Sequence, residues 1–93
     1  MKKEQIVPMY HVYILECADG TFYTGSTNDL RERLRKHNNT KSGARYTKIR
    51  RPVILRYSEL CKGRGAALSR ELVIKRLSRA KKLDLIDEFR SPY

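Results

Sequence analysis

Two short runs rich in β-branched and aromatic residues lie close together near the start of the chain. They span Tyr10–Cys17 and Thr21–Gly25, and only Ala18-Asp19-Gly20 separates them. Valine, isoleucine, threonine and aromatic residues favour strands, and Asp-Gly between two such runs is a strong signal for a tight turn. The sequence therefore predicts a β-hairpin, on which the rest of a 93-residue chain has to pack.

The segment after the hairpin predicts a helix followed by a loop. Ser26–Asp29 is a cluster of residues that favour the N-cap position, and its first and last members could form an acidic capping box. A helix over about residues 28–38 would place Leu30 and Leu34 on one side, four positions apart. A polar loop is then expected as far as about Arg51.

The C-terminal half predicts a third strand and two helices. Val53–Leu60 alternates after Pro52 and is expected to be the strand. A helix over about residues 66–77 would be buried through Leu68, Leu72, Val73 and Leu77. Ser78 could cap a last helix over about residues 79–89, with Leu83, Ile86 and Phe89 facing inward.

These elements predict an α+β fold in the order ββαβαα, a small three-stranded antiparallel sheet flanked by helices. The length allows one domain, which we place at residues 10–93 after a short flexible tail at residues 1–9. Hydrophobic residues make up 40% of the chain, which argues against a disordered basic tail.

No apolar run is longer than the four residues Val12–Leu15, which argues against a membrane span, and the N-terminus lacks the hydrophobic region of a signal peptide. Cys17 and Cys61 lie 44 positions apart, which suggests neither a disulfide framework nor a zinc site. We therefore expect a monomeric cytoplasmic domain with reduced thiols.

The positive charge is concentrated in one block. The chain has a net charge of +11, and residues 31–56 hold ten basic residues and one acidic residue, a net +9. Phosphate backbones are the commonest cellular polyanion, so this block favours a nucleic-acid partner over a merely solubilising face. The cations expected to contact nucleic acid are Arg31, Arg35, Lys36, Lys41, Arg45, Lys48, Arg50 and Arg51.

Five other side chains are candidates for chemistry. Tyr13 and Tyr23 lie on the predicted hairpin, Arg33 and His37 share one face of the next helix, and Glu71 is a lone acid among basic and apolar neighbours. Each also has an ordinary structural explanation. The two tyrosines could be strand aromatics, and Arg33 could be a solvated helix residue. His37 could favour the helix C-terminus, and Glu71 could pair with a lysine four residues on.

The spacing of these residues resembles the GIY-YIG nuclease superfamily. His11-Val12-Tyr13 is followed ten positions on by Tyr23-Thr24-Gly25, and Arg33 lies eight residues past that glycine. The resemblance extends from Tyr10 to about Ile86 and is closest to small stand-alone bacterial members without an added DNA-binding domain. The stretches that also resemble this subgroup are Ala44–Lys48, Arg50–Val53 and Tyr57–Glu59.

The resemblance implies hydrolysis of a phosphodiester bond with one divalent metal ion, Mg²⁺ or Mn²⁺. Tyr13 and Tyr23 match the tyrosines that position and activate the attacking water, and Arg33 matches the arginine that grips the scissile phosphate. His37 matches a proton-handling group one turn later, and Glu71 matches the metal-binding glutamate.

The implied substrate is DNA, in branched, damaged or single-stranded form, cut with little sequence specificity unless a protein partner supplies it. The first motif reads His-Val-Tyr instead of Gly-Ile-Tyr and the second Tyr-Thr-Gly instead of Tyr-Ile-Gly. Many superfamily members also carry an asparagine after the metal glutamate, whereas no asparagine follows Asn39 here. The alternatives are a nucleic-acid-binding module of the same fold with little or no activity, or a basic domain that docks on another protein.

The hairpin turn provides a test of the site. A two-residue turn would place Glu16 opposite Tyr23 and the two tyrosines on opposite faces of the sheet. A three-residue turn with Gly20 in the left-handed region would place Leu15 opposite Tyr23, and Tyr13 on the same face as Tyr23. Because the resemblance requires both tyrosines on one face, we predict the three-residue turn.

Overall fold

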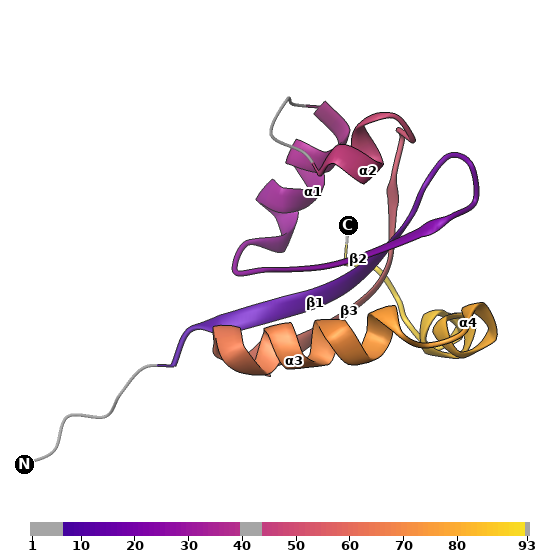
Figure 1. Ribbon diagram of the computed structural model, residues 1–93. Helices are drawn as coiled ribbons and strands as arrows, with labels where there is room; N and C mark the ends of the chain where they lie inside the picture. Colours follow the sequence, from indigo (N-terminus) through magenta and orange to yellow (C-terminus); the bar gives the residue numbers. More distant parts are fainter. Residues whose placement is uncertain (1–6, 40–43, 93) are drawn as a thin grey trace, which may run out of the picture.

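The computed structural model describes residues 7–39 and 44–92 and contains a three-stranded antiparallel sheet between two layers of helices (Figure 1). The strand order is β2-β1-β3, which confirms the predicted α+β fold. In Figure 1, α1 and α2 lie on one side of the sheet and α3 and α4 on the other. The elements are β1 (Met9–Glu16), β2 (Phe22–Thr27), α1 (Leu30–Asn39), α2 (Arg45–Lys48), β3 (Ile54–Lys62), α3 (Arg64–Lys75) and α4 (Arg79–Asp87).

The hairpin turn has three residues, as predicted. Leu15 pairs with Tyr23, and Gly20 has a φ of +82°, which a residue with a side chain rarely adopts. The Cys17 amide donates to the Thr21 carbonyl at 2.8 Å and so closes the ladder below the turn. Tyr13 lies opposite Gly25, so the side chains of Tyr13 and Tyr23 project from the same face.

The sheet has an apolar core on each face because successive residues of β1 point to opposite sides. Tyr13 and Leu15 pack with Leu30 under α1, whereas Val12 and Ile14 pack against α3 and α4. The members of the first core are Tyr13, Leu15, Cys17, Leu30, Val53 and Leu55; those of the second are Val12, Ile14, Ala67, Ile74 and Ile86. Both thiols are free, as expected.

Two expectations about local structure were wrong. The segment predicted as a polar loop contains α2, a single helical turn that adds one element to the predicted order. The proposed capping box between Ser26 and Asp29 does not form. Asp29 itself caps α1, with its Oδ1 accepting from the Glu32 amide at 3.2 Å. The Ser78 cap on α4 is confirmed, since the Ser78 hydroxyl oxygen accepts from the Lys81 amide at 3.2 Å.

The inward face of α3 was also predicted incorrectly. Leu68, Leu72 and Val73 are 45%, 53% and 50% exposed, and the buried residues of this helix are Ala67 and Ile74. A small alanine at the contact lets the helix axis approach the sheet closely. Leu83 of α4 is likewise more exposed than predicted, at 39%, while Ile86 is buried and Phe89 packs on the first core.

Six residues of the predicted N-terminal tail, 1–6, lie outside the described residues, and β1 begins at Met9. Within residues 7–39 and 44–92, no helix has the length and apolar character needed to cross a membrane.

Gly25 is required by the close approach of the Tyr13 ring. A Cβ at residue 25 would lie 2.5 Å from the Tyr13 hydroxyl oxygen and 2.7 Å from its Cζ. We expect Gly25→Ala to destabilise the protein by about 1–3 kcal/mol, because the buried ring has to move. The measurement is the free energy of unfolding from urea denaturation.

Gly65→Ala is the matched control for this prediction. Gly65 lies in the first turn of α3, and a Cβ there would meet nothing within 4 Å. The substitution should leave stability unchanged or raise it, because alanine has the higher helix propensity. Equal stability of the wild type and Gly25→Ala would contradict the proposed packing.

Candidate active site

Tyr13 and His37 meet in the buried space between β1 and α1. The Tyr13 hydroxyl lies 2.9 Å from Nε2 of His37, and the two side chains are almost completely buried. The histidine reaches the tyrosine because α1 starts at the Asp29 cap, directly after β2, and runs back over the same face of the sheet. The contact joins a strand to a helix through two polar side chains.

The other ring nitrogen of His37 contacts α2. Nδ1 lies 2.8 Å from the Thr47 hydroxyl oxygen, which in turn lies 2.9 Å from the carbonyl oxygen of Ala44. Thr47 is fully buried. The Tyr13 hydroxyl, the His37 imidazole and the Thr47 hydroxyl therefore each have a hydrogen-bond partner within the protein.

Tyr23 completes an aromatic cluster around His37. Its ring centroid lies 5.1 Å from that of His37 and 6.4 Å from that of Tyr13. On its outer side Tyr23 stacks with Tyr46 of α2 at 6.1 Å, and the Arg50 guanidinium lies 3.8 Å from the centre of the Tyr46 ring. These contacts hold Tyr23 at the rim of the buried Tyr13–His37 pair.

Burial and charge keep both members of the pair neutral at neutral pH. Desolvation and then the charge of Tyr23 raise the pKa of Tyr13 to about 12, although the neighbouring Arg33 guanidinium opposes this shift. Desolvation, followed by the charges of Arg33 and Arg51, lowers the pKa of His37 to about 4. A lowered pKa argues against the charged histidine that was considered as the structural alternative for His37.

Arg33 and Glu71 lie at different distances from this cluster. The Arg33 guanidinium is near enough to the Tyr13 hydroxyl to lower its pKa by hydrogen bonding and by charge. Glu71 lies on α3, and its carboxylate is near enough to Tyr13 for its negative charge to help raise the pKa of the hydroxyl. The structure thus brings Tyr13, Tyr23, Arg33 and His37 together, and Glu71 acts on Tyr13 through its charge from α3.

Glu71 is a half-buried carboxylate with one cationic neighbour. Its side chain is 15% exposed, and its Oε2 lies 2.7 Å from the Lys75 ammonium, the ion pair considered as the structural alternative. Among the described residues, no group of three or more His, Cys, Asp or Glu side chains could hold a metal ion. A lone carboxylate suits Mg²⁺, which usually keeps several waters and takes one or two carboxylates together with substrate phosphates.

Several residues of the basic block also stabilise the fold. Arg35 pairs with Glu32 at 2.6 Å, and Arg50 binds Asp19 of the hairpin turn at 3.0 Å. The Arg51 guanidinium donates to the last carbonyls of α1, those of Lys36 and His37.

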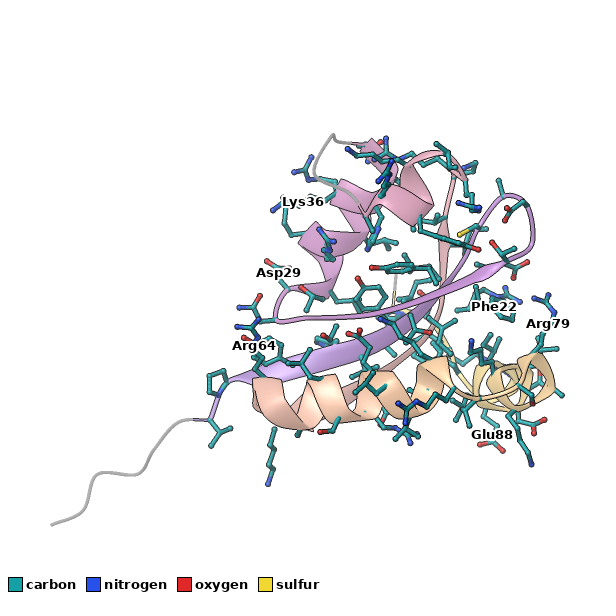
Figure 2. The ribbon with its side chains drawn as sticks, in the orientation of Figure 1. Phe22, Asp29, Lys36, Arg64, Arg79 and Glu88 are labelled. Carbon is teal, nitrogen blue, oxygen red and sulfur yellow. The ribbon has the colours of Figure 1, made fainter. Side chains whose placement is uncertain are left out.

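The other predicted cations lie on α1 and α2. Arg45 and Lys48 are exposed on α2, Arg31 is exposed on α1, and Lys36 lies on α1 where Figure 2 labels it. Lys41 falls outside the described residues.

Thr47 and Tyr46 are the site residues that sequence reasoning missed. Residues 44–48 stood out only through the cations Arg45 and Lys48 and as a stretch that resembles the small stand-alone subgroup. Nothing in their periodicity indicates that a one-turn helix will cover the tyrosine pair, because that contact forms only when α2 docks.

Burial of neutral His37 makes stability depend on pH. Its folded pKa of about 4 lies below the value of 6.5 for an exposed histidine, so the unfolded chain binds more protons as the pH falls. This contribution is fully present above pH 6.5 and is lost between pH 6.5 and 4. Between pH 7 and pH 5 we expect a loss of about 2 kcal/mol from His37.

Urea denaturation at several pH values measures this loss, with His37→Gln as the comparison because glutamine does not titrate. The variant should lose less stability than the wild type over the same interval. Parallel pH profiles for the two proteins would show that His37 titrates normally in the folded state.

Comparisons with known proteins identify the family of this chain. The chain matches the GIY-YIG catalytic domain family over residues 9–84. It is 49% identical over 79 residues to a UPF0213 protein of Desulfotalea psychrophila, which covers 85% of this chain and 72% of that protein. A UPF0213 protein of Staphylococcus saprophyticus is 52% identical over 79 residues, covering 85% and 95% of the two chains.

Two solution NMR structures are similar to the fold. That of a UPF0213 protein from Bacillus halodurans has a TM-score of 0.56 and 40% sequence identity, covering 91% of this chain and 89% of that one. That of a protein from E. faecalis has a TM-score of 0.58 and 33% identity, covering 100% and 98%. Because the family match spans the sheet and most of the helices, and relatives share about half of their aligned residues with it, this chain belongs to the GIY-YIG nuclease family and is one of its UPF0213 members.

Proposed function

We propose that this protein is a metal-dependent endonuclease that hydrolyses phosphodiester bonds in DNA with little sequence specificity. The observation that carries the proposal is the Tyr13–His37 hydrogen bond with Arg33 beside it, in a chain of the GIY-YIG family. The arrangement offers a phosphate-binding cation next to a tyrosine hydroxyl that can pass on a proton.

Arg33 is the residue that would bind the scissile phosphate. Its guanidinium is permanently charged and planar, and it can hold two phosphate oxygens at once, which a lysine ammonium cannot match. Its position on α1 beside the Tyr13 hydroxyl would bring a bound phosphate close to the tyrosine pair.

Tyr13 and His37 would act together as the proton acceptor. A water molecule attacking the phosphate would give its proton to the Tyr13 oxygen while the Tyr13 proton moves to Nε2 of His37. In the free site this transfer is unfavourable, because burial raises the pKa of Tyr13 and lowers that of His37. A phosphate bound to Arg33 would offset the positive charge that lowers the pKa of His37, so substrate binding itself favours the transfer.

Glu71 would hold the divalent ion together with the substrate. GIY-YIG nucleases typically use such an ion, and the half-buried carboxylate provides the hard oxygen that Mg²⁺ or Mn²⁺ prefers. When bound, the ion supplies electrostatic stabilisation of the negative charge that develops on the phosphate. Bringing Glu71 to the ion requires its carboxylate to share or release Lys75.

The substrate would lie over the surface formed by α1 and α2. This surface holds Arg31, Arg35, Lys36, Arg45 and Lys48. Cations that contact phosphates carry no base-sequence information, which favours recognition of DNA shape or of single strands. Branched or damaged DNA would offer both a distinct shape and single-stranded segments.

A binding module with little activity is the alternative, and two observations favour it. Lys75 already neutralises Glu71, and no asparagine follows Asn39 to take the C-terminal position that many relatives fill. Such a protein would bind the same nucleic acids without cutting them.

Cleavage assays test the proposal directly. We expect purified protein to cut duplex, forked or single-stranded DNA, or RNA, in the presence of Mg²⁺ or Mn²⁺ and to stop in the presence of a chelator. Glu71→Gln and Arg33→Ala should each lower kcat/KM by about 100-fold, because the first removes the carboxylate that would hold the metal ion and the second removes the cation that would bind the phosphate. Rates are compared at equal protein concentration.

Matched variants of exposed residues that the proposed site does not include control for general effects. Glu88→Gln and Arg90→Ala alter exposed residues at the end of α4 and should leave the rate unchanged; Figure 2 labels Glu88 there. Cleavage that survives Glu71→Gln would remove the proposed metal site. Binding without cleavage of any substrate would replace the nuclease by the binding module.

Binding to DNA should weaken steeply with salt if phosphates are the target. We expect Lys48→Gln, on the exposed side of α2, to reduce the slope of log K against log salt concentration by about one. Fluorescence anisotropy of a labelled oligonucleotide measures the slope. Lys81→Gln on α4 is the control and should not change it, whereas affinity independent of salt would favour docking on a protein.

A further inference from the structure

The short helix α2 is held from both sides although it is too short to be stable alone. It has four residues, and an isolated helix of that length does not form in water. Arg50 connects its end to the hairpin turn through Asp19 and donates to the Tyr46 carbonyl at 2.9 Å. The Arg50 carbonyl also accepts from the Ala18 amide at 2.9 Å.

These contacts fix Thr47 under α1. The threonine side chain is fully buried, and its hydroxyl lies between the Ala44 carbonyl at 2.9 Å and Nδ1 of His37 at 2.8 Å. On the outer side of the same turn, Tyr46 stacks on Tyr23. The rest of α2 therefore holds Thr47 in place, and this fixes the position of its hydroxyl relative to Nδ1 of His37.

The hydroxyl determines which nitrogen of His37 carries the proton. A threonine hydroxyl has one hydrogen, and a carbonyl oxygen can only accept. If that hydrogen is donated to Ala44, the Thr47 oxygen can only accept from Nδ1, so Nδ1 must be protonated. A neutral imidazole then has its free lone pair on Nε2, which faces the Tyr13 hydroxyl.

We propose that Thr47 is a positioning residue that holds His37 in the Nδ1–H tautomer, with the Nε2 lone pair directed at the Tyr13 hydroxyl. The hydrogen bonds then run in one direction, from Tyr13 to His37 to Thr47 to the Ala44 carbonyl. The catalytic consequence rests on the proposed function, because only this tautomer can receive the Tyr13 proton. The tautomer itself does not depend on it.

NMR of ¹⁵N-labelled protein at neutral pH tests the structural part. Long-range proton–nitrogen correlations of the His37 ring identify which nitrogen is protonated, and we expect Nδ1–H in the wild type. Thr47→Val keeps the shape of the side chain but removes the oxygen, so the Nε2–H form should become substantially populated. Thr47→Ser restores the hydroxyl and should restore the wild-type tautomer.

Cleavage kinetics test the consequence. Thr47→Val should lower kcat by about 100-fold with little change in KM, since it removes proton transfer and leaves Arg33 in place. Thr47→Ser should recover most of the loss. A purely structural role would lower activity in proportion to the unfolded fraction, and this is measured by urea denaturation of each variant.

The outcomes of these experiments distinguish the role of Thr47 from the proposed nuclease activity. Nε2–H in the wild type, or Nδ1–H retained in Thr47→Val, would overturn the role of Thr47 whatever the activity. If Thr47→Val does not fold, the wild-type and Thr47→Ser spectra still decide the tautomer. The expected tautomers without detectable cleavage of any substrate would leave the role of Thr47 intact and contradict the proposed nuclease.

Discussion

The hydrogen bond between Tyr13 and His37 joins the two halves of the structure that form the site. One partner belongs to the central strand of the sheet and the other to the helix above it, and burial of both makes the bond costly to break without replacement. Gly25 makes room for the tyrosine ring, and the three-residue turn sets the pairing that places Gly25 there. The Tyr13–His37 hydrogen bond therefore depends at once on the pairing in the hairpin, on the absence of a side chain at residue 25 and on where α1 starts.

The basic block has two physical roles. Arg50 and Arg51 bind Asp19 and the end of α1, so they stabilise the segment that covers the tyrosines. The charge of Arg51 also acts on the site, since burial, Arg33 and Arg51 together lower the pKa of His37. The arginines that stabilise this part of the fold also place positive charge beside the buried His37. An anionic substrate would offset this charge.

The two faces of the sheet differ in how their polar groups are satisfied. Under α1 the buried polar groups form a chain of neutral hydrogen bonds. On α3 the charged side chains form ion pairs, Arg70 with Glu59 at 2.7 Å and Glu71 with Lys75 at 2.7 Å. Neutral hydrogen bonds thus join β1 to α1 and α2, whereas ion pairs join α3 to β3 and link successive turns of α3.

The sequence by itself determined the hairpin and the shared helix face of Arg33 and His37, because these follow from strand composition and from the period of the helix. Local turn chemistry left a two-residue and a three-residue turn open, and the family resemblance selected the three-residue turn that places Tyr13 and Tyr23 on one face. It did not determine which face of α3 is buried, since Leu68, Leu72 and Val73 provide an apolar stripe as strong as that of Ala67 and Ile74. Only close packing against the sheet selects the face with the small alanine. Nor did it predict α2 or Thr47, because a single turn has no stability of its own and exists through its contacts with Asp19, Tyr23 and His37. The tertiary structure thus decided how the histidine is held, and the reason is that the groups holding it are distant in sequence and meet only in the packed state.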